Sequence, residues 1–583
     1  MDFFNGLTMV GGLALFLYGM KTMGDALSKM AGGKLEGVLE KMTSNPLKAV
    51  LLGAGVTAVI QSSSATTVMV VGFVNSGIMK LSQAVYIIMG ANIGTTVTSW
   101  ILSLAGIEGT NFWLKLMKPS SFSPILALIG IILIMFVKDN KKKDIGTIMI
   151  GFAILMFGME TMSGAVKPLA NVPEFTSLFT AFENPILGMA VGAILTAIIQ
   201  SSSASVGILQ AMCMTGSVTF GAAIPVIMGQ NIGTCVTALL SGIGASKNAR
   251  RASLVHLYFN LIGTALFMVV FYSLNTFMKF SFLSTAAGAS DIAVIHSLFN
   301  IGATIVLMPF GKLLEKLAIL TIPVTEDENK EVKVNMLDER FLESPAFAVA
   351  QCKSAVVEIA KMVEKAMVLT SQLVSGYDEA VAKQVVELEY QVDMKEDELS
   401  IYLTRLSAKE LSERDSKLVA MYGKWISDLE RISDYLKSTT YVFRKLHITG
   451  EKFSDAAMKE TETIMKASKE IVENTIVCIC EGNLDMALSI DPLADVISNL
   501  KQDIRRNHNE RLVQGTCSVE LGMSLSDIVT NLDRVGRHCS NIAEETIAHE
   551  TDKYALHEYA RSLKEGNESY KDLLSSYKER FSI

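Results

Sequence analysis

The chain contains one stretch of sequence twice. Residues 61–65 read Gln-Ser-Ser-Ser-Ala and return at residues 200–204, 139 positions later. At the same offset, residues 89–95 and 228–234 both read Met-Gly-x-Asn-Ile-Gly-Thr. Hydroxyl-rich and glycine-rich copies inside apolar sequence indicate internal repeats, which many transporters use to build a binding site.

Charge divides the chain into two parts. Up to Leu320 there are 19 Lys and Arg against 12 Asp and Glu, a net charge of +7, whereas the remainder carries 33 and 47, a net charge of -14. We therefore expect a transmembrane domain over residues 1–320, a linker over 321–339 and a soluble domain over 340–583. The acidic soluble part has no basic stripe, which argues against nucleic acid as a partner. The seven cysteines form no CxxC pair, which fits a reducing cytosol.

The hydropathy pattern predicts several membrane spans and two interrupted segments. A span needs about 20 apolar residues. Full spans are expected near 5–26, 82–105, 122–138, 145–166, 221–243, 252–278 and 291–318. Segments 46–79 and 185–218 each have two apolar halves, too short to cross singly and too long together for one span. They are predicted to be re-entrant hairpins, with the Gln-Ser-Ser-Ser break at the tip.

The number of crossings predicts how the copies are oriented. Three spans separate Gly19 from Gly158, and an odd number inverts the second copy. The expected fold is therefore all-α, with inverted repeats at about 5–138 and 145–278 and an extra span at 291–318. Lys- and Arg-rich segments fall on one predicted side together with the soluble domain, at 21–48, 138–143 and 247–251. By the positive-inside rule this side is cytoplasmic and the N-terminus is outside.

A simpler interpretation is an ordinary helical membrane protein whose small residues pack at helix contacts. It accounts for the glycines. It does not account for polar residues that interrupt both hairpins at the same place.

The repeated residues suit ions at membrane depth. Gln supplies donors and an acceptor, and each Ser supplies one donor and lone pairs. Helix N-termini at the tips would favour an anion, and hydroxyl and carbonyl oxygens would favour sodium. Asn92 and Asn231 follow each hairpin and would face the tips. Because no Arg lies in either hairpin, co-bound cations would balance an anion, which favours cation coupling.

A smaller repeat, His-x-x-Phe-Asn, begins at His256 and at His296. These histidines could relay protons across the membrane. The alternative is helix packing, with Asn260 and Asn300 as polar contacts between helices.

These motifs resemble the type II sodium/phosphate cotransporters and their bacterial relatives over about residues 5–318. The resemblance implies a multi-pass protein of the bacterial plasma membrane that carries phosphate with sodium. By matching position, it implies phosphate and sodium binding by Gln61, Ser62, Ser63, Ser64, Thr66, Asn92, Thr95, Gln200, Ser201, Ser202, Ser203, Ser205, Asn231 and Thr234. One position departs, because Cys235 stands where the first copy has Thr96 and a thiol is a poor sodium ligand.

The soluble part reads as two sets of about three helices and resembles PhoU, the phosphate-signalling regulator. Residues 389–393 and 428–434 resemble its first pair of E/D-xxx-D helices. That resemblance implies iron or zinc held by Glu389, Asp393, Glu430 and Asp434. The alternative is an acidic, solvated helix face with salt bridges. In the second set, Arg537 replaces an expected Asp and would repel a metal.

The leading functional hypothesis is a sodium-coupled phosphate symporter with a cytosolic PhoU-like regulatory domain. The alternatives are a phosphate-sensing membrane protein or a phosphate exporter. An enzyme is not expected, because the sequence has no nucleophile–base arrangement and no GxxxxGK[ST] loop. The expected partners are phosphate, sodium and the lipid bilayer. The sequence leaves open whether the protein forms a homo-oligomer.

Overall fold

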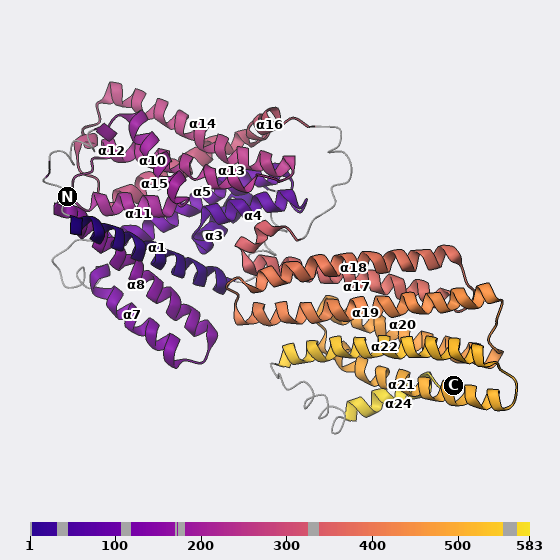
Figure 1. Ribbon diagram of the computed structural model, residues 1–583. Coiled ribbons are helices and arrows are strands. Elements are labelled where there is room, and N and C mark those ends of the chain that lie inside the picture. Colours follow the sequence, from indigo (N-terminus) through magenta and orange to yellow (C-terminus); the bar gives the residue numbers. More distant parts are fainter. Residues whose placement is uncertain are drawn as a thin grey trace. The chain divides into compact units, whose positions relative to one another are not determined.

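A computed structural model describes residues 3–31, 45–106, 118–168, 172, 181–324, 337–551 and 568–583. Its regular elements within these ranges are helices, so the predicted all-α fold is confirmed. The chain forms two compact units, Met1–Phe347 and Ala348–Ile583 (Figure 1). Residue 340, where we expected the soluble domain to begin, lies inside the first unit. Most of the expected linker lies outside the described residues.

The N-terminal unit holds thirteen α-helices within the described ranges. They are α1 (Phe3–Ala31), α3 (Pro46–Ile60), α4 (Ser63–Asn75), α5 (Leu81–Ser103), α7 (Pro119–Phe136), α8 (Asn140–Val166), α10 (Pro185–Ile199), α11 (Ser202–Cys213), α12 (Phe220–Gly233), α13 (Cys235–Ser241), α14 (Lys247–Met278), α15 (Ala289–Leu307) and α16 (Gly311–Thr321).

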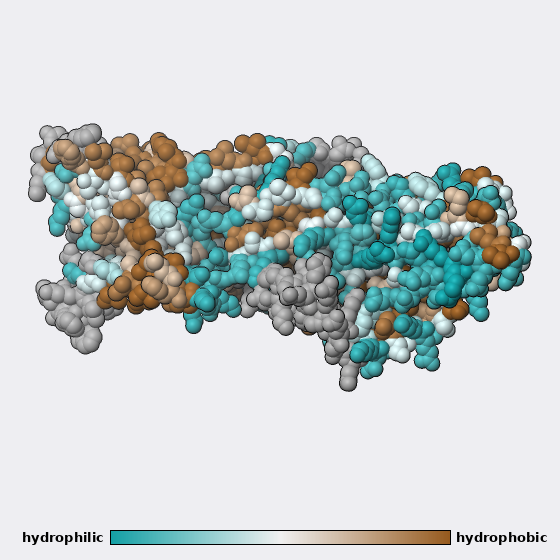
Figure 2. Space-filling model, turned by 60° about the horizontal axis from the view of Figure 1, so that its bottom comes forward, coloured by the Kyte–Doolittle hydropathy of each residue, from teal (hydrophilic) through white to brown (hydrophobic). Residues whose placement is uncertain are grey.

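Several of these helices suit a bilayer by length and composition. Among the residues that the structure describes, five helical stretches are long and apolar enough to cross, namely Leu81–Gly106, Asn140–Val166, Phe220–Ser241, Lys247–Met278 and Ala289–Thr321. Large apolar side chains are exposed on this unit, among them Ile198 at 75% and Phe277 at 86%. Figure 2 shows hydrophobic surface gathered over the N-terminal unit, while the visible face of the C-terminal unit is mainly hydrophilic. Such apolar exposure is typical of a lipid-facing surface.

Both interrupted segments fold as pairs of short helices. Asn45 caps α3 by accepting from the Leu47 amide at 2.9 Å, and Pro46 takes the first helical position. Helices α3 and α5 run parallel, because Gly90 abuts the carbonyl of Val50 and Gly94 that of Ala54. The chain must therefore return to the start of α3 before α5 begins, and α4 makes that return.

The second copy repeats this arrangement. Asn184 caps α10 by accepting from the Ile186 amide at 3.1 Å. Gly229 abuts the carbonyl of Met189 and Gly233 that of Ala193, so α10 and α12 are parallel and α11 returns between them. A Cβ at any of these glycines would collide with backbone, and this explains why glycine recurs there.

The first helices of the two copies pack against each other in opposite directions. A Cβ built on Gly19 would lie 2.6 Å from the carbonyl oxygen of Gly151, and one on Gly158 would lie 2.7 Å from that of Gly12. With the offset of 139, Gly151 is the counterpart of Gly12 and Gly158 that of Gly19. The contacts therefore exchange equivalent residues, as in a two-fold interface.

The bases of the two hairpins lie at opposite ends of α14. Asn75, at the base of the first hairpin, accepts a hydrogen bond of 2.7 Å from the amide of Ser246, which caps the start of α14. The base of the second hairpin pairs with the segment after α14, where Ala287 donates to the Val218 carbonyl at 2.8 Å. A helix of 32 residues is about 48 Å long. The two hairpins thus enter the unit from opposite ends.

The C-terminal unit is a bundle of long helices in two successive sets. They are α17 (Pro345–Gln372), α18 (Glu379–Ser407), α19 (Glu413–Thr449), α20 (Asp455–Glu481), α21 (Leu484–Val513), α22 (Val519–Thr551) and a final short helix, α24 (Glu568–Arg580). Helices α19, α20 and α21 are followed by Gly450, Gly482 and Gly515, each with a positive φ. Helices α19 and α22 pack together and join the two sets (Figure 1).

Candidate functional site

Each hairpin tip is a sharp reversal between two helix ends. Gln61 follows α3 with φ 60° and Gln200 follows α10 with φ 57°, the left-handed conformation that non-glycine residues rarely adopt. The next serine caps the second arm in both copies. Ser62 accepts from the Ala65 amide at 3.1 Å, and Ser201 accepts from the Ala204 amide at 3.2 Å. A strained residue retained at both tips indicates a functional demand on the geometry.

The ends of the helices give each tip an electrostatic character. The first arm contributes its C-terminus, whose partial negative charge favours a cation. The second arm contributes its N-terminus, whose partial positive charge favours an anion. A site built from both ends suits a cation and an oxyanion bound together.

The predicted site residues are mostly buried inside the N-terminal unit. The buried ones are Gln61, Ser63, Thr66, Asn92, Thr95, Ser202, Ser203, Ser205, Asn231 and Thr234. Ser62, Ser64 and Ser201 are half-buried, and Gln200 is exposed. The two tips therefore differ, since the glutamine is enclosed in the first and open in the second.

In the first hairpin, hydroxyl groups bond to each other across the two arms. Thr57 Oγ1 donates to Thr66 Oγ1 at 3.0 Å, and Thr66 Oγ1 donates to the Ser62 carbonyl at 3.0 Å. This chain of hydrogen bonds satisfies the hydroxyl groups and fixes the spacing of the arms.

The second hairpin has the same positions without that bond. Thr196 and Ser205 are the counterparts of Thr57 and Thr66 and are fully buried, yet their hydroxyl oxygens have no partner among the described residues. Gln230 lies beside them and donates from Nε2 to the Ser205 carbonyl at 3.0 Å, while its Oε1 is also without a partner there. An unsatisfied buried polar group costs about 1–3 kcal/mol. The second hairpin therefore carries buried oxygens whose hydrogen-bonding capacity is unsatisfied in the described structure.

The Asn-Ile-Gly-Thr stretches pack against the last turns of the first arms, at Thr57 and at Thr196. A Cβ on Gly94 would lie 2.5 Å from Thr57 Cβ, so α5 passes the end of α3 at close range. Thr95 and Thr234 donate to carbonyls one turn earlier in their own chain, at 3.2 and 3.0 Å. Cys235 points elsewhere, toward the His256 carbonyl at 3.5 Å.

Sequence reasoning missed a set of residues that connects the two hairpins. Thr98 Oγ1 donates to Gln61 Oε1 at 3.0 Å. On the next residue, the Ser99 carbonyl accepts from Gln210 Nε2 at 3.0 Å, and the same nitrogen donates to the Ala289 carbonyl at 3.0 Å. Residues 98 and 99 of α5 thus hold the first tip and an arm of the second hairpin. Comparing the copies could have revealed Gln210, because its counterpart is Val71.

The histidine motifs serve contacts between helices. His296 Nδ1 lies 2.9 Å from Ser99 Oγ, and Asn300 Nδ2 donates to the His296 carbonyl at 2.9 Å. Asn260 donates to the His256 carbonyl at 2.9 Å. The two asparagine–carbonyl bonds lie within single helices, whereas the His296–Ser99 bond joins α15 to α5 and Asn260 Nδ2 also donates to Cys235 Sγ of α13 at 3.4 Å. The bonds between helices match the packing interpretation of the repeat.

The residues expected to bind iron or zinc do not fit a metal centre. Asp393 and Asp434 are exposed, and Lys437 Nζ lies 2.7 Å from Glu389 Oε1. Burial, together with neighbouring Asp434, raises the pKa values of Glu389 and Glu430, while Lys437 opposes the shift at Glu389. Within the parts of the chain that the structure describes, no three His, Cys, Asp or Glu side chains are grouped to hold a metal.

The second set carries its own cations. Asp533 is 2% exposed and pairs with Lys501 at 2.7 Å and with Arg537 at 2.8 Å. Carboxylates in both halves of the C-terminal unit therefore pair with Lys or Arg. This agrees with the alternative to a metal site, an acidic helix face with salt bridges.

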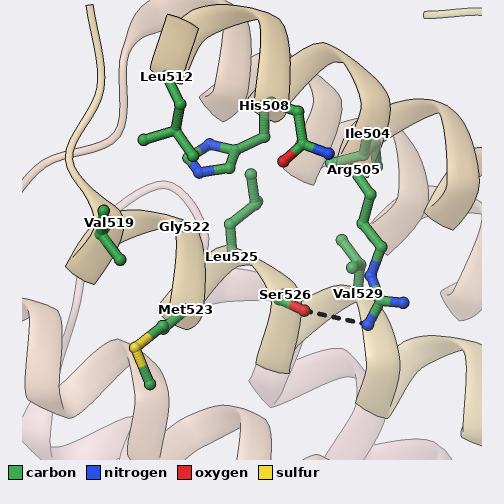
Figure 3. A pocket seen from close by; sticks show the side chains of 11 residues that line it. Ile504, Arg505, His508, Leu512, Val519, Gly522, Met523, Leu525, Ser526 and Val529 are labelled. Carbon is green, nitrogen blue, oxygen red and sulfur yellow. Dashed lines mark hydrogen bonds between the residues drawn. The ribbon is translucent and has the colours of Figure 1, made fainter. Parts of the chain in front are cut away.

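The C-terminal unit also has a pocket of about 300 Å³ between α21 and α22 (Figure 3). Its walls are mainly aliphatic, and Arg505 lies along one side, donating to Ser526 at 3.0 Å. His508 and Gly522 line it as well. The pocket lacks the hydroxyl-rich character of the hairpin tips.

Comparison with known proteins agrees with this arrangement. A family model described as Na+/Pi-cotransporter matches residues 15–164 and again 154–290, and a PhoU domain model matches 356–440 and 462–546. The "Uncharacterized protein YqeW" of Bacillus subtilis is 30% identical over 312 residues, which cover 53% of this chain and 96% of that protein. The chain belongs to the Na+/Pi-cotransporter family. This is a phosphate transporter family and not an enzyme family.

Two further relatives carry functional names. The "Putative inorganic phosphate export protein YjbB" of Salmonella typhimurium is 25% identical over 461 residues, 79% of this chain and 82% of that protein. The "Sodium-dependent phosphate transport protein 2A" of Rattus norvegicus is 41% identical over 99 residues, 16% of this chain and 15% of that protein. Among solved structures, PhoU from Pseudomonas aeruginosa matches 35% of this chain and 97% of its own, with 21% identity and a TM-score of 0.34.

Proposed function

We propose that this member of the Na+/Pi-cotransporter family moves inorganic phosphate together with sodium, through a site formed by the two Gln-Ser-Ser-Ser tips. The observation that carries the proposal is the set of buried oxygens at the second tip. Thr196, Ser205 and Gln230 present oxygen atoms without partners in the described structure. Sodium is a hard cation that oxygen ligands suit, and a bound cation would balance the charge of phosphate.

The binding residues of the proposed site divide between the two ions. Ser63 and Ser64 with Ser202 and Ser203 begin the second arms, where amide groups and hydroxyls offer donors to phosphate. Thr66, Ser205, Asn92, Thr95, Asn231 and Thr234 contribute oxygens near the ends of the first arms, where a cation is favoured.

We infer that the two copies form inverted repeats with the tips meeting near the middle of the membrane. The antiparallel packing of α1 and α8 supports this, as do the hairpin bases at opposite ends of α14. We further propose that the base of the first hairpin and the C-terminal unit are cytoplasmic, because Lys and Arg concentrate at 21–48, 138–143 and 247–251.

Purified protein in liposomes tests the coupling. Uptake of radiolabelled phosphate should be fast with an inward sodium gradient and slow with an equal potassium gradient. Equal uptake in the two salts would refute sodium coupling. Imposing the gradient in the opposite direction separates import from export, a choice that the name of the YjbB relative raises.

A phosphate sensor is the second candidate, favoured by the PhoU domain matches. Deleting residues 348–583 discriminates between the two functions. A transporter keeps phosphate flux without this unit, whereas a sensor that signals through it loses its output.

A further inference from the structure

A short segment before the C-terminal unit is anchored on the N-terminal unit. Asp338 is 6% exposed, accepts from the Arg340 amide at 2.9 Å, and pairs with the Arg340 guanidinium at 2.7 Å. Arg340 Nε also donates to the Ser241 carbonyl at 2.8 Å. These bonds attach residues 338–347, here called the clasp, to the end of α13.

The clasp is bonded to the first hairpin. Asn75 is the last residue of α4, and its Nδ2 donates to Asp338 Oδ2 at 2.5 Å. Its Oδ1 accepts from the Ser246 amide at 2.7 Å. One side chain therefore joins the hairpin arm, the clasp and the start of α14.

Aromatic packing secures the same contact. Phe341 and Phe347 lie against Phe73 of α4 with ring centroids 5.6 and 4.6 Å away, and all three rings are buried. A Cβ on Gly72 would lie 2.7 Å from the Phe341 ring, so glycine makes room for it. The counterpart of Gly72 in the second copy is Ala211.

The clasp continues directly into the C-terminal unit. Helix α17 begins at Pro345 inside the N-terminal unit and runs on as the first helix of the PhoU-like unit. At its other end, α4 begins with Ser63 at the tip. Thirteen helical residues thus separate the tip from the clasp.

We propose that the clasp is a regulatory restraint, through which the PhoU-like unit holds the first hairpin in place and slows phosphate transport. This inference rests on the proposed function, since it assigns regulation to the same site. A contact that stabilises one arrangement of a moving element lowers the rate at which the element leaves it. By linkage, releasing the clasp and binding phosphate must influence each other.

Gly72→Ala tests the restraint. Alanine favours a helix more than glycine does, so α4 should persist while the added methyl displaces the Phe341 ring.

Ser344 is 8% exposed, and a cysteine placed there reports on release of the clasp. The half-buried Cys480 and Cys517 are replaced by Ser, and the other five cysteines are buried. In full-length purified protein, we expect Ser344→Cys to react with a maleimide at least about tenfold faster when Gly72→Ala is present.

Gly55→Ala is the matched control, because Gly55 lies on the first arm of the same hairpin and has open space around its Cα. It should leave the reaction rate unchanged. Phe341→Ala provides a second route to release that does not alter the hairpin, and it should also expose Ser344→Cys. In liposomes, both releasing variants should turn over phosphate faster than the parent.

Two results would overturn the proposal. Ser344→Cys could stay unreactive in both releasing variants, which would show that these contacts do not hold the segment. Alternatively, it could react while phosphate turnover and affinity stay at parental values, which would show that the clasp does not regulate the site. Absence of phosphate transport in the parent would refute the proposed function instead, and the thiol rates would still decide whether the clasp exists.

Discussion

Thr98 Oγ1 donates a 3.0 Å hydrogen bond to Gln61 Oε1 and so ties α5 to the tip of the first hairpin. Thr98→Val removes the hydroxyl at nearly constant volume and leaves a buried amide oxygen without its donor. Such a loss costs about 1–3 kcal/mol. We expect the apparent phosphate affinity in liposome uptake to fall about tenfold, with normal protein levels.

The counterpart, Thr237→Val, is the control for this change. The Thr237 hydroxyl has no partner among the described residues, so its removal breaks no bond there. An equal loss of affinity in both variants would show that the effect does not come from holding Gln61.

Gln210→Val replaces the amide by the residue found at the same place in the first copy. The amide nitrogen of Gln210 donates to the Ser99 and Ala289 carbonyls, and these bonds position the second hairpin against α5. The substitution removes this donor. We expect a several-fold increase in the KM for phosphate with a smaller change in maximal rate. The reason is that a smaller fraction of the protein molecules has both hairpin tips in the arrangement that binds phosphate. Ser99→Ala keeps the carbonyl acceptor and should retain a normal KM. A fall in maximal rate alone would argue against this positioning role.

The orientation of the hairpins can be tested by thiol labelling of intact cells. From the sequence, Ser44 and Ser177 are candidate labelling positions on the two sides, but both lie outside the described residues. Lys48 and Ser284 are exposed near the bases of the first and second hairpins. In the background with Cys480 and Cys517 replaced, Ser284→Cys should react with a membrane-impermeant reagent and Lys48→Cys should not. Equal labelling of both positions would contradict inverted repeats.

Glu430→Gln tests a half-buried carboxylate of the C-terminal unit. Burial first, and then Asp434, raises the pKa of Glu430 in the folded state. A raised pKa means that this group supports folding at low pH and that the support is lost as pH rises through the folded pKa. Glutamine stays neutral, so the variant should unfold at a higher temperature than the parent at pH 8 and at a similar temperature near pH 4. A lower unfolding temperature at pH 8 would show that the charge is stabilising.

The repeat made much of the fold predictable from sequence. The Asn-Pro pairs mark the helix starts at Pro46 and Pro185, and the Gln-Ser-Ser-Ser breaks mark both reversals, because capping and chain reversal are encoded locally. The soluble helices end at glycines for the same reason. The break between α18 and α19 carries no such local signal, since residues 408–412 contain no glycine or proline.

Contacts between distant segments could not be predicted from motifs. The partnership of Thr98 with Gln61 depends on the parallel packing of α5 and α3, which no local signal specifies. The sequence motif around Glu389 gave no sign of its ion pair with Lys437. That lysine lies 48 residues away in sequence and supplies the positive charge that a metal would otherwise supply. Likewise, the clasp joins Asn75 to Asp338 across 263 residues.

Equilibrium binding of radiolabelled phosphate to the purified protein tests the central claim most directly. The account predicts saturable binding in sodium and at least several-fold weaker binding in potassium. Gln61→Ala and Gln200→Ala should each weaken binding in sodium by a similar factor, because each removes amide donors and an acceptor from a tip. Unchanged binding in both variants, at normal protein levels, would place the phosphate site away from the hairpin tips and contradict the account.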